Sequence, residues 1–313
     1  MSRCLVLGSN GFIGTHLVNA LISRGHTVRA FDRDWSRTRY KQHEAVTFMQ
    51  GDFLNRADLA VAVKDMEYVF HFISTTTPAT ADADPLIDVE TNIRMSIELF
   101  SICAENKTKR IIFASTGGSV YGEGGDRPKN EADNPLPVSP YAIGKLTIEH
   151  YLRYFKVKHN LDYIVARISN PDGEFQALHA KQGVIPVFTE NILLGNPITV
   201  LGDGSMERDY IYVGDVAAII SKIFDKPNAQ NIYNIGSGVA TSLKQIITAV
   251  QEAVGRRATV DTVAAPPTFI QKIVLDVSRL ESDFGQKATT SLNEGLLKTC
   301  AYIQKELEHE QAV

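Results

Sequence analysis

The chain has 313 residues, a formal net charge of −4 and 44% hydrophobic residues, enough for the core of one large or two medium domains. It has no basic run suited to nucleic acid, and no apolar stretch near the roughly 20 residues that span a membrane. Its three cysteines are scattered, match no zinc spacing or disulfide framework, and fit a reducing cytoplasm. The histidines show no metal spacing either, so no metal site is expected.

Strand-like and helix-like segments alternate over the first two thirds of the chain. The expected strands are Arg3–Leu7, Thr27–Phe31, Val46–Met49, Tyr68–Phe72, Arg110–Ala114 and Asp162–Arg167. The expected helices are Phe12–Ser23, Arg56–Val63, Asp88–Glu105 and Tyr141–Lys158. Such alternation predicts an α/β fold, in which a doubly wound parallel sheet carries helices on both faces.

After Ile168 the pattern loosens into turns, short strands and helices. The helices expected there are Val213–Phe224, Leu243–Val254 and Leu292–Lys305. We therefore expect residues 1–168 to form the domain with the parallel sheet. Residues 169–313 should mainly form a smaller C-terminal α/β domain that binds the substrate, with some segments returning to the first domain.

A Gly-x-x-Gly-x-x-Gly run joins the first expected strand to the first expected helix. Glycines at such a turn let the backbone approach a diphosphate, and the helix N-terminus offers free N–H groups and a partial positive charge. This arrangement predicts a Rossmann-type dinucleotide site. Its candidate residues are Gly8, Asn10, Gly11, Phe12, Ile13 and Gly14.

Acidic residues follow the next two strands. Asp32 ends the second strand, where a carboxylate accepts hydrogen bonds from a ribose 2′-hydroxyl and repels a 2′-phosphate, which favours NAD over NADP. Arg33 beside it could soften that preference. Asp52 and Phe53 follow the third strand, where a side chain can meet the adenine, although a plain turn is nearly as good an interpretation.

Tyr141 and Lys145 stand one helical turn apart, just after Ser139–Pro140, which suits a helix start. A free phenol has a pKa of about 10, and a nearby ammonium favours its phenolate and lowers that pKa. The pair is therefore a candidate proton-transfer device, although an exposed Lys145 also fits the local sequence. A second pair at this spacing, Tyr154 and Lys158, is interpreted as an exposed helix face.

Together these motifs resemble the extended short-chain dehydrogenase/reductase family, specifically its NAD-dependent sugar-nucleotide epimerase/dehydratase group. The resemblance covers nearly the whole chain and is more specific for the family than for a substrate. Besides the glycine run, Asp32 and the Tyr141/Lys145 pair, it depends on Phe113–Gly122, Arg167–Pro171 and Arg208–Val216.

The resemblance implies that Tyr141 is the catalytic acid/base, and that Lys145 binds the nicotinamide ribose and lowers the pKa of the tyrosine. It implies Thr116 as the hydroxyl that hydrogen-bonds the reacting oxygen, while an alternative alignment selects Ser115. The further contacts that it implies are Phe72 and Asn92 at the cofactor site, Asn170 and Arg208 at the substrate diphosphate, and Val184, within residues 182–187, along the nucleotide base.

Two glycines indicate which reaction is expected. Relatives that dehydrate or decarboxylate sugar nucleotides usually carry acidic residues after Thr116, whereas this chain has Gly117 and Gly118. The resemblance therefore implies NAD-dependent epimerisation of a nucleotide-diphospho-sugar, foremost a UDP-hexose or UDP-N-acetylhexosamine, at C4 through a transient 4-keto sugar. The alternatives are a dehydratase or reductase of the same family, or a catalytically silent dinucleotide-binding sensor.

One segment departs from the family pattern. Relatives often carry an arginine and then an aspartate where this chain has Pro266–Phe269. A contact to the nucleotide is therefore expected to be missing. The family also implies a homodimer, formed through the helices near Asp88–Glu105 and Tyr141–Lys158.

Overall fold

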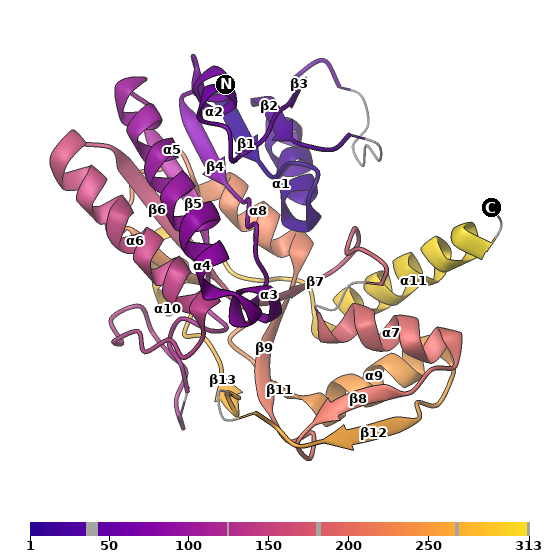
Figure 1. The fold of residues 1–313 in the computed structure, drawn as a ribbon. Helices are drawn as coiled ribbons and strands as arrows, with labels where there is room; N and C mark the ends of the chain where they lie inside the picture. Colours follow the sequence, from indigo (N-terminus) through magenta and orange to yellow (C-terminus); the bar gives the residue numbers. More distant parts are fainter. Residues whose placement is uncertain (36–42, 124, 180–182, 267–268, 312–313) are drawn as a thin grey trace.

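The computed structural model describes residues 1–35, 43–123, 125–179, 183–266 and 269–311. At its centre is a seven-stranded parallel sheet with the order β10-β6-β5-β4-β1-β2-β3 (Figure 1). Its strands are β1 (Arg3–Leu7), β2 (Thr27–Asp32), β3 (Val46–Gln50), β4 (Tyr68–His71), β5 (Arg110–Thr116), β6 (Asp162–Ile168) and β10 (Ile232–Ile235). The expected α/β class and the six N-terminal strands are confirmed, with ends that differ by a residue or two.

Helices cover both faces of this sheet (Figure 1). On one face, α2 (Arg56–Val63), α5 (Arg94–Glu105) and α6 (Pro140–His159) enclose one apolar core. On the other, α1 (Phe12–Ser23), α8 (Val213–Ile223) and α10 (Ser278–Phe284) enclose a second. The strands between them are apolar on both sides, as a sheet buried on both faces requires.

The rest of the C-terminal half forms a smaller second part. Its own apolar core lies among α7 (Val184–Leu194), α9 (Leu243–Val254), α11 (Leu292–Gln311) and the paired strands β8 (Ile198–Leu201) and β12 (Val260–Val263). A small sheet of β7 (Asn170–Asp172), β9 (Glu207–Tyr212), β11 (Ala240–Ser242) and β13 (Lys272–Ile273) runs between the two parts (Figure 1). The chain then returns to the large sheet, where α8 packs on α1 and β10 pairs with β6.

The helix expected over Asp88–Glu105 is not uniform. A six-residue π-helical turn, η1 (Asp88–Ile93), precedes α5, after the short helices α3 (Pro78–Ala83) and α4 (Pro85–Ile87). π turns occur mostly as single turns and are frequent at functional sites. Here the wide turn packs against α6 and brings Asp88 close to Gly144.

A buried ion pair fixes α6 to the sheet. The Arg167 guanidinium of β6 lies 2.7 Å from the Glu149 carboxylate of α6, and each side chain is only 3% exposed. Ser115, near the end of β5, donates a hydrogen bond of 2.5 Å to the same carboxylate. Two neighbouring strands therefore hold one point of the helix.

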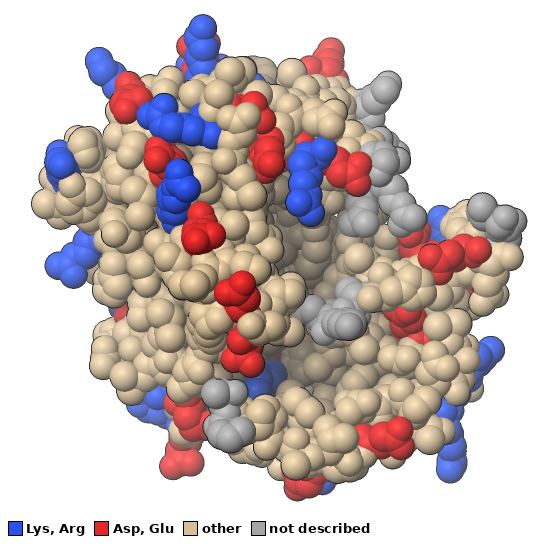
Figure 2. Space-filling model, in the orientation of Figure 1, with Lys and Arg blue, Asp and Glu red and all other residues tan. Residues whose placement is uncertain are grey.

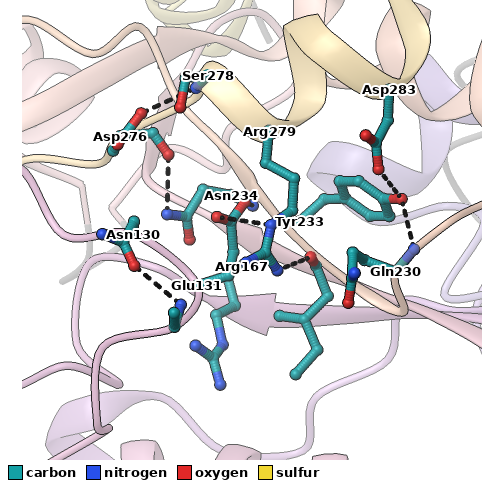
Figure 3. A network of polar contacts seen from close by, with 12 residues as sticks. Asn130, Glu131, Arg167, Gln230, Tyr233, Asn234, Asp276, Ser278, Arg279 and Asp283 are labelled. Carbon is teal, nitrogen blue, oxygen red and sulfur yellow. Dashed lines mark hydrogen bonds and ion pairs between the residues drawn. The ribbon is translucent and has the colours of Figure 1, made fainter.

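The network continues from Arg167 toward β10. Arg167 donates to the Tyr121 hydroxyl, which donates to the buried Asn234 side chain. Asn234 in turn donates to the carbonyl oxygens of Lys129 and Asp276. Figure 3 shows Asn234 between the segment at Asn130 and Glu131 and the chain at Asp276. These bonds join three distant segments beneath the carboxyl ends of the strands.

Replacing Glu149 with Gln should destabilise the fold by about 3–5 kcal/mol, because Arg167 would stay buried without a counter-charge. Urea denaturation followed by circular dichroism measures this change. Glu98→Gln is the matched control, because its pair with Arg56 is exposed and such pairs contribute about 0–1 kcal/mol. Equal stability of the two variants would contradict the anchoring role of the buried pair.

Candidate active site

A cleft of about 540 Å³ lies at the carboxyl ends of the large sheet's strands. Open α/β sheets bind ligands at this edge. Figure 2 shows a hollow between the two parts of the molecule, with scattered charges of both signs around it. The predicted site residues that line the cleft are Phe12, Ile13, Phe72, Ser115, Thr116, Tyr141, Lys145, Asn170, Val184 and Arg208.

The glycine run forms a tight turn in which some polar groups have no described hydrogen-bond partner. Gly8 has a φ of +80°, and a Cβ at Gly14 would lie 2.0 Å from the Gly8 carbonyl oxygen, so neither position accepts a side chain without a shift. No side chain caps the N-terminus of α1. Among the described residues, the buried Ser9 Oγ and Asn10 Oδ1 have no hydrogen-bond partner. Free N–H groups and the Ser9 hydroxyl can donate to the diphosphate of a dinucleotide.

Asp32 lies at the carboxyl end of β2, beside this turn. Its carboxylate accepts hydrogen bonds from the backbone N–H groups of Asn10, at 2.9 Å, and Arg33, at 2.8 Å. It is half-buried, whereas Arg33 is exposed. The carboxylate is therefore held where a ribose of the dinucleotide would pass.

The other predicted cofactor residues stand back from the cleft. Asp52 is exposed and caps its own turn by accepting from the Leu54 N–H. Phe53 is 3% exposed, and the centre of its ring lies 5.2 Å from the centre of the His71 ring, so its side chain belongs to the core. Only the backbone of Phe53 could contact a cofactor. Asn92 is buried and holds the loop after β4, because its Oδ1 accepts from the Thr75 N–H at 2.9 Å.

The start of α6 places Tyr141 and Lys145 side by side. Ser139 caps the helix by accepting from the Ala142 N–H, and Pro140 occupies the first turn. Lys145 Nζ donates to the Ala114 carbonyl oxygen of β5 at 3.0 Å and lies 5.7 Å from the centre of the Tyr141 ring. The pair is therefore held at the carboxyl end of β5, on the wall of the cleft.

The electrostatic environment of this pair differs from the expectation. Burial, together with the Asp88 carboxylate, raises the pKa of Tyr141 to about 12. Burial lowers the pKa of Lys145 to about 8, against the opposing effects of Asp88 and Glu149. In the protein alone the net shift of the Tyr141 pKa is upward, so the lowering expected from Lys145 stays a prediction.

The two candidate hydroxyls at the end of β5 have different partners. Ser115 donates to Glu149 inside the buried network. Thr116 also lines the cleft, and its hydroxyl makes no hydrogen bond within the described part of the chain. The geometry therefore favours Thr116 as the hydroxyl available to a substrate.

Arg208 of β9 is held by backbone carbonyl oxygens. Nη1 donates to Glu207 at 2.9 Å and Gln271 at 3.3 Å, and Nη2 donates to Ile270. These three bonds leave the Nε–H and one Nη2–H of the guanidinium without a described partner, and such a pair of donors matches two phosphate oxygens. The Phe269 ring lies 5.7 Å from the guanidinium carbon.

Phe269 belongs to the segment that departs from the family pattern. Pro267 and Thr268 of that segment lie outside the described residues, so the expected loss of a nucleotide contact is not tested there. What the structure shows is that Phe269 packs against Arg208.

Asn170 and Val184 lie on the side of the cleft formed by the second part. Asn170 donates its amide to the Asp209 carbonyl oxygen at 2.9 Å, and a Cβ at Gly118 would lie 3.3 Å from its Oδ1. Val184 begins α7, whose N-terminus has no side-chain cap and faces the cleft. Gln182, at the start of the expected base-binding segment, lies outside the described residues.

Comparison with known proteins identifies the family. The model of the "NAD dependent epimerase/dehydratase family" matches residues 4–236. The chain belongs to this family. NAD as the cofactor is thereby confirmed, in agreement with the glycine turn and Asp32.

Three relatives of the chain in this family illustrate its range. A UDP-glucose 4-epimerase of Thermotoga maritima, solved with UDP-glucose, is 32% identical with a TM-score of 0.90, covering 97% of this chain and 99% of that one. A UDP-glucose 4-epimerase of Thermus thermophilus, solved with NAD, is 31% identical with a TM-score of 0.89, covering 96% and 99%. The dTDP-4-dehydro-6-deoxyglucose reductase of Escherichia coli is 31% identical, covering 96% and 97%.

Sequence analysis of this epimerase/dehydratase family member missed one acidic residue of the cleft wall. Asp172, at the end of β7, is 3% exposed and accepts a hydrogen bond from the Thr299 hydroxyl at 3.2 Å. Burial raises its pKa from 3.8 to about 7. In the sequence, Asp172 could have been noticed by its position two residues after Asn170. Only the fold shows that α11 packs over it.

Two negative findings complete the description. In the described ranges, no group of three or more His, Cys, Asp or Glu side chains could hold a metal ion. No helix there is long and apolar enough to cross a membrane.

Asp172→Asn should stabilise the protein at neutral and alkaline pH. Between about pH 4 and pH 7 the folded protein keeps a proton on Asp172 that the unfolded chain releases, so wild-type stability falls as the pH rises through this window. Removing the ionisation should raise the free energy of unfolding at pH 8 by about 1–4 kcal/mol, with no gain below pH 4.

Urea denaturation at a series of pH values checks this prediction. Asp82→Asn, at an exposed position of α3, is the control and should follow the wild-type curve. A parallel curve for Asp172→Asn at every pH would contradict a neutral, buried Asp172.

Proposed function

We propose that the protein catalyses NAD-dependent epimerisation at C4 of a UDP-linked hexose or N-acetylhexosamine. The observation that carries the proposal is the position of Tyr141 and Lys145 on the wall of one cleft. Phe12 and Ile13, which follow the glycine turn, line the same cleft, as do Asn170 and Arg208. Relatives of about 30% identity over nearly the full chain act on UDP-sugars by their titles.

Each described group has a role in this reaction. Tyr141 takes the proton of the C4 hydroxyl as a phenolate and returns it to the product. Thr116 hydrogen-bonds the reacting oxygen, and Lys145 binds the nicotinamide ribose. Bound NAD supplies the hydride chemistry, and its positively charged ring favours the phenolate that burial alone disfavours. Asn170 and Arg208 hold the diphosphate while the 4-keto sugar turns over, so that binding far from C4 supports the reaction.

Packing explains why acid/base side chains are missing after Thr116. A Cβ at Gly117 would lie 2.5 Å from Leu275 Cδ1 and 2.8 Å from the Arg167 carbonyl oxygen. An acidic side chain at this position would require the backbone to shift. This supports epimerisation over dehydration, which needs a further acid/base group. The Escherichia coli relative makes reduction the second candidate.

The charges of the cleft favour a neutral sugar. Among its described lining residues the cations are Lys145 and Arg208, and both have roles in the proposed reaction. The carboxylate of a uronic acid would find no further cation there and would approach buried Asp172. An uncompensated buried charge is costly.

Product analysis tests the proposal. The purified protein is incubated with UDP-glucose, UDP-N-acetylglucosamine, UDP-glucuronic acid and dTDP-glucose, and products are identified by NMR and mass spectrometry. We expect C4 epimers of the neutral UDP-sugars without added cofactor, at least about tenfold faster than from UDP-glucuronic acid. Loss of water, or consumption of added NAD(P)H, would replace the proposal by one of its alternatives.

Tyr141→Phe identifies the group responsible within the same assay. It should lower kcat by about 10²–10⁴, because the general acid/base is lost, and leave the NAD content of the purified protein unchanged. Tyr154→Phe is the matched control: Tyr154 has the same spacing to Lys158, and its ring is 47% exposed. Near-normal turnover by Tyr141→Phe would contradict the assignment.

We also propose a homodimer that buries an exposed apolar face. This face joins α4, the π turn η1 and α6 with the loop before α6. Its residues are Leu86, Ile87, Val89, Leu136, Val138, Ile143, Tyr151, Tyr154 and Val157. Exposed apolar side chains on neighbouring elements are typical of a surface that contacts another protein.

Val157→Asp should convert this dimer to a monomer, because it places a charge on the most exposed apolar residue of the face. Size-exclusion chromatography with light scattering measures the mass. Leu297→Asp, at a 54% exposed position of α11, is the control and should leave the mass unchanged. A monomeric wild-type protein would contradict the proposed dimer.

A further inference from the structure

A buried carboxylate stands next to the proton-transfer pair and has no part in the roles assigned above. Asp88 opens the π turn η1 and is 4% exposed. Its Oδ1 accepts hydrogen bonds from the Thr76 hydroxyl, at 2.5 Å, and from the Asn92 amide, at 2.8 Å. These two donors fix the orientation of the carboxylate.

Its second oxygen lies against the backbone of α6. A Cβ at Gly144 would lie 1.8 Å from Asp88 Oδ2, so only glycine leaves room for the carboxylate at this position. Glycine inside a helix costs about 1 kcal/mol relative to alanine. The helix thus carries an unfavourable residue next to Lys145 and three residues after Tyr141, where the acid lies.

Asp88 acts on the pair through space. Lys145 Nζ donates to the Ala114 carbonyl oxygen, and no ion pair joins it to Asp88. The titratable groups that act on Lys145 are Asp88 from the π turn and Glu149 from α6, and the lysine in turn acts on His71 of β4. Glu149 is already neutralised by Arg167.

Tyr141 has a simpler environment. Apart from burial, the influence on its ionisation comes from Asp88. Within the described structure, Asp88 is therefore the carboxylate that affects the ionisation of both Tyr141 and Lys145.

We propose that Asp88 is a positioning residue that sets the protonation state of the Tyr141/Lys145 pair, with Gly144 providing the space for its carboxylate. The negative charge keeps the buried ammonium protonated and keeps the phenol protonated until cofactor and substrate bind. The π turn serves this arrangement, because it presents Asp88 to α6 while Asn92, one turn later, holds its Oδ1. The inference rests on the proposed function in so far as the pair carries the reaction.

The direction of the effect follows from the charge. Asp88 raises the pKa of both Tyr141 and Lys145. Without it, the phenol would ionise at lower pH and the ammonium would also lose its proton at lower pH. In the enzyme with its cofactor bound, the pH window in which phenolate and ammonium coexist would therefore move as a whole toward acid.

Asp88→Asn tests this, because the amide oxygen still accepts from Thr76 and Asn92 while the charge is removed. Both limbs of the pH profile of kcat/KM should shift to lower pH by about one unit. Glu90→Gln, an exposed acid on the same π turn, is the control and should leave both limbs in place. A lower kcat with unmoved limbs would show a merely structural role and overturn the inference.

A second readout needs no substrate. In protein labelled with ¹³C at the lysine ε-carbon, the Lys145 signal, assigned by its loss in Lys145→Arg, should titrate at lower pH in Asp88→Asn. Gly144→Ala should shift the Lys145 titration in the same direction, since the new methyl displaces the Asp88 carboxylate. This variant replaces Asp88→Asn in the test if Asp88→Asn does not fold. Titration of the Lys145 signal at the wild-type pH in both variants would overturn the inference. Shifted titration without epimer formation supports the inference and contradicts the proposed function.

Discussion

The buried ion pair between Glu149 and Arg167 determines where the reactive groups lie. Glu149, Lys145 and Tyr141 follow one another at intervals of four residues, so they share one face of α6. Glu149 is fixed to β5 and β6 through Ser115 and Arg167. Lys145, one turn nearer the helix start, then reaches the Ala114 carbonyl oxygen. Tyr141, one turn further, comes to lie on the wall of the cleft. A structural contact thus sets the geometry of the proposed catalytic pair.

Burial gives this geometry at an electrostatic cost. The enclosed site that aligns the phenol also raises its pKa to about 12, and it lowers that of the neighbouring ammonium to about 8. Both changes disfavour the charged forms that proton transfer needs. The protein alone therefore holds the tyrosine as a neutral phenol. In the proposed reaction the positive charge of bound NAD would counter this, which would couple proton transfer to the presence of the cofactor.

Local chemistry explains which features were predictable from sequence. The strands buried on both faces are continuous apolar runs, the glycine turn has a fixed spacing, and Ser139 with Pro140 marks the start of α6. Each depends on neighbours in the chain. The π turn at Asp88 was missed because a helical pattern of apolar residues does not reveal one extra residue in a turn. The addition of β10 to the large sheet was missed because its partner, β6, is distant in the sequence: Ile232 pairs with Val165, 67 residues earlier.

Side-chain roles were less predictable, because tertiary contacts decide them. Ser115 and Thr116 are adjacent hydroxyls in sequence, yet only the fold shows that Ser115 is bonded to Glu149. Phe53 follows a strand at the expected place for an adenine contact, but its ring is in the core. Burial raises the pKa of Asp172, and the Thr299 hydroxyl of α11, from the far end of the chain, opposes this shift by donating to the carboxylate.

Phe269, at the end of the segment that departs from the family pattern, contributes to the position of Arg208. In this chain Phe269 packs against the guanidinium of Arg208, and the carbonyl oxygens of the following residues hold two of its nitrogen atoms. Ring contact and carbonyl bonds restrict the arginine before any ligand binds, so less side-chain entropy is lost on binding. Glu123 in turn accepts from the N–H groups of Gln271 and Lys272. The Phe269 ring and the carbonyl oxygens of Ile270 and Gln271 thus hold Arg208 at the wall of the cleft.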